Sequence, residues 1–113
     1  MNIETIFKSL KNDKTDFAKE TLNHLLTRCP TSLALTCEIF KIAKKISFKD
    51  CLQMDYYFSQ IMIRRDDFIN GINEVLVNKT HSPKWNPNSI TGINDKIKVY
   101  FNEILSKKLA LDI

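Results

Sequence analysis

Glycine and proline are scarce in this sequence, which has only 2 glycines and 3 prolines among 113 residues. Sheets joined by tight turns use both residues repeatedly, because glycine adopts positive φ angles and proline fixes the turn. Their scarcity argues against a β-rich fold and against most glycine-rich phosphate-binding loops. The hydrophobic fraction of 43% is nevertheless typical of a folded, globular chain rather than a disordered one.

Metal-binding and disulfide-forming residues are also few. The three cysteines, Cys29, Cys37 and Cys51, form no CxxC pair, and their odd number argues against a disulfide framework. His24 and His81 lie far apart in the sequence and flank no other ligand pattern. We therefore expect a reduced chain with buried cysteines, no metal site and no bound cofactor.

Long apolar runs are missing as well, since none approaches the length of a membrane span and the first residues contain no apolar signal core. We expect a soluble protein of the cytoplasm, or of a matrix-like compartment, with no membrane partner. The net charge of +4 is a mild bias that a lysine-rich, solvated surface explains. The densest basic stretch, at 41–49, lacks the interleaved aromatics of single-strand binders. We expect no nucleic-acid partner, and weak nucleic-acid binding is the third-ranked hypothesis.

Apolar residues recur at helical spacing along most of the chain, so the predicted fold is all-α with about six helices and no strand. The predicted helices are 3–11, 15–28, 31–45, 47–64, a fifth that begins at 66–67, and 93–107. The segment 78–92 is expected to be an irregular loop and the tail at 109–113 to fray. No linker or repeat divides the chain, so we treat 1–113 as a single helical unit.

Polar residues mark several of the expected helix boundaries. Asn2 and Ser47 are plausible N-caps, because their side-chain oxygens can accept free backbone N–H groups of a first turn. Pro30 is expected to end the second helix, since the residue before a proline is pushed away from helical angles. Thr31 or Ser32 would then cap the third helix.

No catalytic motif is present: the sequence contains neither a nucleophile elbow nor an HExxH pattern. Asp66 and Asp67 are adjacent, and adjacent helical residues point about 100° apart, so a helix N-terminal charge is preferred to an acid–base pair. The stripe Tyr56-Tyr57-Phe58 is expected to pack in the core. We therefore assign no catalytic residue.

Two residues indicate close packing near the irregular loop. Gly71 lies inside the fifth helix, where glycine costs about 1 kcal/mol relative to alanine, so another backbone or helix is expected to approach it. Trp85, the only tryptophan, stands between Pro83 and Pro87. Such a loop is either a binding edge or a strap packed on the body, and the strap is preferred.

Three blocks of residues also follow one another in a recognisable order. They are Cys-Pro-Thr-Ser-Leu at 29–33 with Leu-Thr at 35–36; Met-Asp-Tyr at 54–56 with Ser-Gln at 59–60; and Asp-Phe at 67–68, Gly71, Val-Leu at 75–76, Lys79 and Ser-Pro-Lys-Trp at 82–85 with Pro87. Together they resemble the C-terminal part of 3-hydroxyisobutyryl-CoA hydrolases, a branch of the crotonase (enoyl-CoA hydratase/isomerase) superfamily. The sequence departs from the family pattern at Asn70 and Asn78, where acidic residues are usual, and at Glu74, where a small residue is usual.

The resemblance implies a CoA thioester hydrolase of valine breakdown that releases 3-hydroxyisobutyrate and CoA. In that family the oxyanion hole and the catalytic carboxylates belong to an N-terminal spiral of strands and helices, which these residues do not contain. The resemblance thus implies a chain that is inactive alone, and its standing as an enzyme is open. Lys79 is the one candidate substrate-binding residue, as a contact to CoA phosphate; the alternative is a solvated lysine. CoA would be part of the substrate, not a cofactor.

The expected partners follow from the missing core. A separate N-terminal hydrolase core, or further copies of this chain, would cover apolar residues that otherwise face water, for example Leu33, Phe40, Ile61 and Val75. The assembled form would then bind the CoA thioester. The alternative hypothesis is a free-standing helical protein-interaction module.

Overall fold

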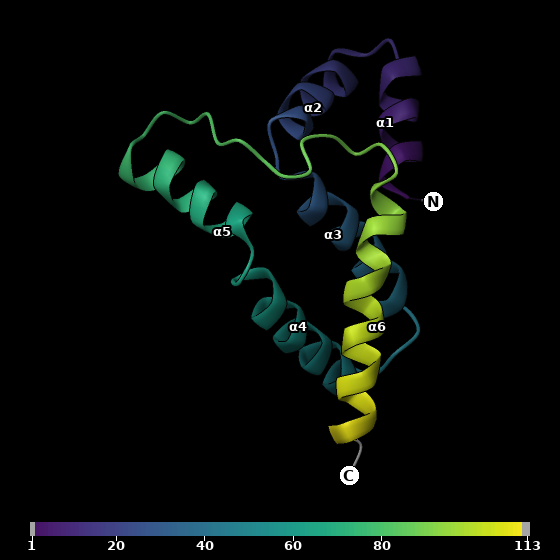
Figure 1. The fold of residues 1–113 in the computed structure, drawn as a ribbon. Coiled ribbons are helices and arrows are strands. Elements are labelled where there is room, and N and C mark those ends of the chain that lie inside the picture. Colours follow the sequence, from purple (N-terminus) through teal and green to yellow (C-terminus); the bar gives the residue numbers. More distant parts are fainter. Residues whose placement is uncertain (1, 112–113) are drawn as a thin grey trace.

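The computed structural model describes the backbone of residues 2–111 and the side chains of residues 2–104 (Figure 1). The elements are α1 (Ile3–Asn12), α2 (Asp16–Leu26), α3 (Pro30–Ala43), α4 (Phe48–Met62), α5 (Asp66–Gly71), the π-helix η1 (Ile72–Val77) and α6 (Ile93–Leu111). No strand occurs in the described backbone, so the all-α prediction is confirmed. Helix α6 extends beyond its expected end at 107; of the tail expected to fray, residues 112–113 lie outside the description.

Side-chain caps start three of the helices, and two of them, Asn2 and Ser47, are the N-caps that the sequence indicates. Asn2 forms a capping box with Thr5: the Asn2 carboxamide oxygen accepts the Thr5 N–H at 2.9 Å, and the Thr5 hydroxyl accepts the Asn2 N–H at 3.0 Å. Thr15 caps α2 by accepting the Ala18 N–H, and Ser47 caps α4 by accepting the Asp50 N–H. These bonds satisfy N–H groups that have no partner inside the helix.

The expected role of Pro30 is wrong. Helix α2 already ends at Leu26, and Pro30 is the first residue of α3, with Cys29 as its N-cap and Thr31 and Ser32 inside the helix. Proline suits this position because its missing N–H would be unpaired there anyway and its fixed φ is helical. Cys29, the residue before it, is extended, as proline requires.

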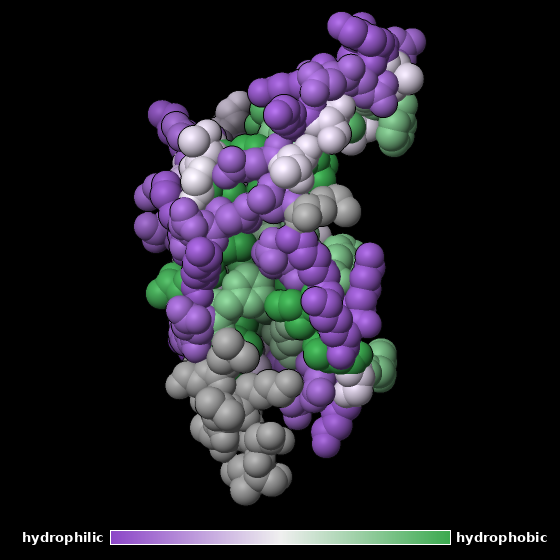
Figure 2. All heavy atoms as spheres, turned by 90° about the vertical axis from the view of Figure 1, so that its right-hand side faces the viewer, coloured by the Kyte–Doolittle hydropathy of each residue, from purple (hydrophilic) through white to green (hydrophobic). Residues whose placement is uncertain are grey.

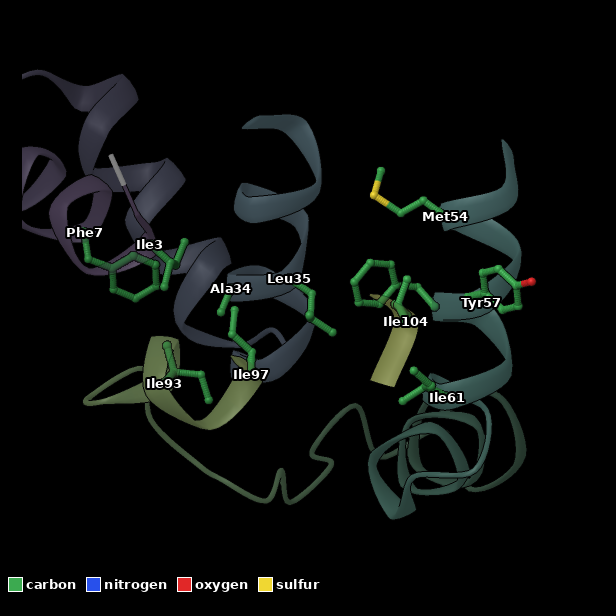
Figure 3. Packing of buried hydrophobic residues seen from close by; sticks show 11 residues of the cluster. Ile3, Phe7, Ala34, Leu35, Met54, Tyr57, Ile61, Ile93, Ile97 and Ile104 are labelled. Carbon is green, nitrogen blue, oxygen red and sulfur yellow. The ribbon is translucent and has the colours of Figure 1, made fainter. Parts of the chain in front are cut away.

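The core forms where α6 packs on α3 and α4 and where α1 packs on α2 and α3. Its buried residues are Ile3, Phe7, Ala34, Leu35, Met54, Tyr57, Phe58, Ile61, Ile93, Ile97 and Ile104. Figure 3 shows that Ile93 and Ile97 meet the side chains of α1 and α3, whereas Ile104 faces α4. Helix α6 therefore contributes core residues both on the side of α1 and α3 and on the side of α4.

The molecule is more open than a compact domain of its length. Its radius of gyration is 15.7 Å and its extents are 49 × 34 × 24 Å, whereas a compact domain of this length is expected to have a radius of about 13 Å. In Figure 1 the arm formed by α4 and α5 diverges from α6. Figure 2 shows hydrophobic side chains reaching the surface at mid-height of one face. No helix among the described residues is long and apolar enough to cross a membrane.

The exposed and buried aromatics only partly match the sequence expectation. Tyr57 and Phe58 are buried as expected, but Tyr56 is 60% exposed, because it turns to the outer face of α4. Phe40 is exposed as expected. Ile61, expected to face water in the isolated chain, is instead buried in the core cluster.

Several residues are intermediate in solvent exposure. Leu33 and Val75, expected to be exposed, are half-buried. The three cysteines, expected to be buried, are half-buried and unbonded to one another. Burial raises the pKa of the Cys37 thiol; neighbouring Glu38 adds to this rise and Lys41 partly opposes it.

Candidate functional site

The segment 78–92, here called the strap, leads from η1 to α6 and crosses the molecule at the level of the junction between α2 and α3 (Figure 1). Contacts at its start, middle and end fix it to the body. These contacts bring together the residues of the third sequence block, so the strap and the helices beneath it are the candidate site.

The start of the strap folds around Glu74 of η1. The Glu74 carbonyl accepts the His81 N–H at 3.0 Å, and its carboxylate accepts hydrogen bonds from the Thr80 hydroxyl and, at 3.3 Å, from the Asn78 side chain. Lys79 and His81 adopt positive φ angles of 56° and 55°, which residues other than glycine rarely adopt. Lys79 is thus exposed on a tight turn held by its neighbours.

The middle of the strap is fixed by Trp85. Its indole N–H donates to the Thr27 carbonyl at 3.0 Å, after α2 has ended. Its ring lies on Gly71, where an added Cβ would stand 3.3 Å from Trp85 Cη2. The expected close approach to Gly71 is therefore confirmed, although the partner is an aromatic ring and not a backbone or helix. The Trp85 segment is a packed strap, as the sequence favours.

Asp67 ties three segments together from a buried position, with 5% of its surface exposed. One carboxylate oxygen accepts the Asn86 N–H at 2.8 Å. The other receives the Cys29 thiol at 3.3 Å and pairs with the Arg65 guanidinium at 3.2 Å. Arg65 also donates to the Asn86 carbonyl at 2.8 Å. Sequence reasoning assigned Asp67 only a helix N-terminal charge and so missed this network; the one available signal was its place beside Trp85 in the third block.

Arg65 is held in its cationic form. Burial opposes the charge, but Tyr100, Asp67 and Cys29 outweigh burial and raise the pKa of Arg65. The guanidinium also lies 5.9 Å from the centre of the Tyr100 ring, within the range of a cation–π contact. The Arg65–Asp67 pair is therefore a fixed structural link, with both carboxylate oxygens already engaged.

A hollow of about 400 Å³ opens beside Trp85, between α3, α5 and η1. Its walls are mostly apolar and consist of Cys29, Ser32, Met62, Asp67, Phe68, Gly71, Ile72, Val75, Leu76 and Trp85. Its two ionisable lining residues are Cys29 and Asp67, and the Cys29 thiol donates a hydrogen bond to the Asp67 carboxylate. The hollow suits an apolar group, because its ionisable groups are engaged and it lacks Lys79.

The three departures from the family pattern all contribute to the fixation of the strap. Asn70 donates its amide N–H to the Lys84 carbonyl at 3.2 Å, a bond that the usual acidic residue could form only when protonated. Glu74 and Asn78 bond to each other at 3.3 Å in the turn at the start of the strap.

Across the described residues, no group of three or more histidine, cysteine or acidic side chains is placed to hold a metal ion.

Comparison with known proteins extends these observations. Residues 1–101 match the profile of the Enoyl-CoA hydratase/isomerase family. The chain is 33% identical over 111 residues to the mitochondrial 3-hydroxyisobutyryl-CoA hydrolase of Xenopus tropicalis, covering 97% of this chain and 29% of that protein. It is 33% identical over 110 residues to the Dictyostelium discoideum enzyme of the same name, covering 95% and 29%.

A third relative has a different role in its name. Over 70 residues the chain is 39% identical to the small ribosomal subunit protein mS47 of Schizosaccharomyces pombe, covering 62% of this chain and 16% of that protein. The chain thus spans less than a third of the length of these curated relatives.

The names of the hydrolases correct one expectation. The hydrolase relatives are named as mitochondrial, which contradicts the predicted cytoplasmic location. Cysteine content and the lack of an apolar signal core could not make this distinction, because mitochondrial targeting segments are amphipathic rather than apolar. The family match and the hydrolase relatives agree with the three sequence blocks. The chain belongs to the enoyl-CoA hydratase/isomerase family, and within it corresponds to the C-terminal part of a 3-hydroxyisobutyryl-CoA hydrolase.

Proposed function

We propose that this chain is the helical part of a CoA thioester hydrolase acting on 3-hydroxyisobutyryl-CoA, and that catalysis requires a separate crotonase-type core. The observation that carries the proposal is its similarity to about 29% of the length of hydrolases with that name. We propose further that this hydrolysis is a step in the breakdown of valine.

The geometry favours a structural role for this chain rather than a catalytic one. The buried polar cluster around Asp67 and Arg65 is engaged in fixing the strap. A thioester hydrolase needs donors aimed at the developing oxyanion, and loss of one such donor typically costs about a hundredfold or more in rate. We therefore expect no measurable hydrolysis by the chain alone.

Apolar side chains supply the surface for a core partner. Phe48, Leu52 and Tyr56 recur every fourth residue on the outer face of α4 and are 79%, 54% and 60% exposed. Such spacing places them in one stripe along the helix. A contiguous apolar stripe on a protein surface is typical of an interaction site.

Co-expression tests the proposal. The chain would be produced with the Xenopus tropicalis hydrolase shortened by the region that this chain matches, and release of CoA thiol from 3-hydroxyisobutyryl-CoA would be measured. We expect a complex that is active while each part alone is not. The matched control carries Phe48→Ser and Tyr56→Ser in the chain and should lose the complex. If neither a complex nor activity forms, the proposal is wrong.

Lys79 is proposed to contact CoA phosphate in that complex. Its exposed position on the turn after η1 leaves its ammonium free to reach a ligand. Lys79→Ala should raise KM for the thioester severalfold with little change in kcat. Lys84→Ala removes another exposed lysine of the same strap and is the matched control. Equal KM values for both variants would mean that Lys79 is a solvated lysine and does not contact CoA.

A second candidate function is a helical protein-interaction module without hydrolase chemistry. The similarity to the ribosomal protein mS47 favours it, since that relative is named for an assembly and not for a reaction. Co-sedimentation with small ribosomal subunits, together with no affinity for CoA and cooperative unfolding as a monomer, would support the module. Binding of CoA thioesters by the reconstituted complex would exclude it.

A further inference from the structure

A second hollow, of about 410 Å³, lies where α1, the turn between α2 and α3, and the end of the strap meet. Its apolar surface comes from three regions far apart in the sequence: Phe7; the residues Leu25, Leu26, Pro30 and Leu33 on either side of the turn between α2 and α3; and Ile90. This volume falls within the range of small-molecule pockets, roughly 300–1,000 Å³. It lacks Trp85 and the Asp67 cluster, and its lining residues are entirely different from those of the Trp85 hollow.

Three cations surround this hollow. Lys8 and Lys11 come from α1, one helical turn apart, and Arg28 comes from the turn before α3. The ion pairs among the described side chains are Lys41–Glu38, Arg65–Asp67 and Lys98–Asp95, so none of the three cations is used in one.

One acidic residue, Glu4, also lines the hollow. Its carboxylate accepts the Gly92 N–H at 3.0 Å and so holds the end of the strap against α1. With three positive charges and one negative charge, the lining carries a net charge of +2. An anion therefore gains from entering the hollow, whereas a neutral or cationic molecule of equal size does not.

We propose that this hollow binds a small organic anion, with an apolar body on the floor and its acidic headgroup between Lys8, Lys11 and Arg28. A carboxylate and a phosphate monoester share this chemistry. The phosphate monoester carries close to two negative charges at neutral pH, so three cations should favour it over the carboxylate. The hollow is concave and only partly apolar, which suits a single small amphipathic molecule better than an extended polymer.

Titration calorimetry with octanoate, octyl phosphate and octanol tests the site in the whole chain. These probes share one alkyl body and differ in headgroup charge. We expect octyl phosphate to bind severalfold more tightly than octanoate, octanol to bind at least tenfold more weakly than octanoate, and added salt to weaken only the two anions. Equal affinity for octanoate and octanol would overturn the proposal without any variant. A preference for octanoate over octyl phosphate would contradict the three-cation headgroup site.

Charge-matched variants locate the binding. The variant K8Q/K11Q/R28Q should bind octyl phosphate at least about tenfold more weakly than the unchanged chain, because each lost charge removes part of the attraction. The control K44Q/K45Q/K49Q removes the same number of exposed positive charges from the basic stretch between the end of α3 and the first turn of α4, and should leave the affinity unchanged. Equal losses in both variants would show attraction to net charge alone and would refute a built site.

Discussion

Asp67 and its neighbour Asp66 are identical in chemistry and differ almost entirely in surroundings. Asp66 is exposed at the start of α5, whereas Asp67 is buried and receives bonds from Arg65, Cys29 and Asn86. Removal of one partner from a buried ion pair leaves the other charge without compensation, which is more costly than the net gain from the pair itself.

Asp67→Ala should therefore lower the free energy of unfolding by about 3 kcal/mol, because Arg65 and the Asn86 N–H lose their acceptor. Asp66→Ala should change it by less than about 0.5 kcal/mol, as is usual for exposed positions. Urea unfolding followed by far-UV circular dichroism measures both values. Equal effects of the two substitutions would mean that the buried network contributes little.

Cys37 supplies a pH-dependent prediction. Burial and Glu38 raise the pKa of its thiol in the folded chain, so the thiolate, which is the reactive form, should appear only above the value of about 8.5 for a free cysteine. Alkylation of Cys37 by iodoacetamide, resolved by peptide mass spectrometry, should therefore begin at higher pH in the folded chain than in urea. Since the folded state holds this proton more tightly, stability from this group is full below pH ~8.5 and falls as pH rises further. Identical alkylation profiles with and without urea would refute the shift.

At the scale of the helices, the helix starts that are set by neighbouring residues could be predicted from the sequence. The caps at Asn2, Thr15 and Ser47 each bond a residue three positions away, so the local pattern contains all the information required. Pro30 shows the limit of local reasoning, because one proline is compatible with the end of a helix and with the start of the next. Helix spacing alone could not decide between these two roles.

The fixation of the strap could not be predicted from local pattern. Trp85 bonds Thr27 across 58 positions, Asp67 meets Cys29 across 38, and Gly92 meets Glu4 across 88. Such pairings depend on how the helices pack, which periodicity does not specify. The resemblance to a family drew attention to the block that contains Asp67, Gly71 and Trp85, but it did not indicate which residues contact each other.

The contact between α5 and the strap can be measured with a double-mutant cycle. Gly71→Val should destabilise the chain by about 1–3 kcal/mol, because the new side chain overlaps the Trp85 ring, which would stand only 3.3 Å from an added Cβ. In a Trp85→Ala background the same change should cost at least about 1 kcal/mol less. Urea midpoints from circular dichroism provide the four stabilities. An unchanged cost in both backgrounds would show that the helix itself, and not the ring, excludes valine.

On the scale of the whole molecule, an open shape and an exposed apolar stripe on α4 occur together. The radius of gyration of 15.7 Å exceeds that of a compact chain of this length, and Phe48 on α4 is 79% exposed. Water contact with this much apolar surface is unfavourable, so association with another surface lowers the free energy.

We predict that the isolated chain self-associates at tens of micromolar concentration. The substitutions F48S, L52S and Y56S together should lower the mass found by sedimentation velocity towards the monomer, since they remove the stripe and lie outside the buried cluster, whose one affected contact is that of the Tyr57 ring with Tyr56. K49S with D55S changes exposed polar residues of the same helix and should have no such effect. A clean monomer of the unchanged chain at high concentration would refute the prediction.

The place of Trp85 gives the chain a natural optical reporter. It is the only tryptophan, and its indole joins the strap to both the end of α2 and the middle of the α5–η1 segment. Its fluorescence therefore changes when the first and second halves of the chain meet, and not when an isolated helix forms. Since a contact across 58 positions requires closure of a long loop, stopped-flow emission would time tertiary assembly separately from helix formation, without any label.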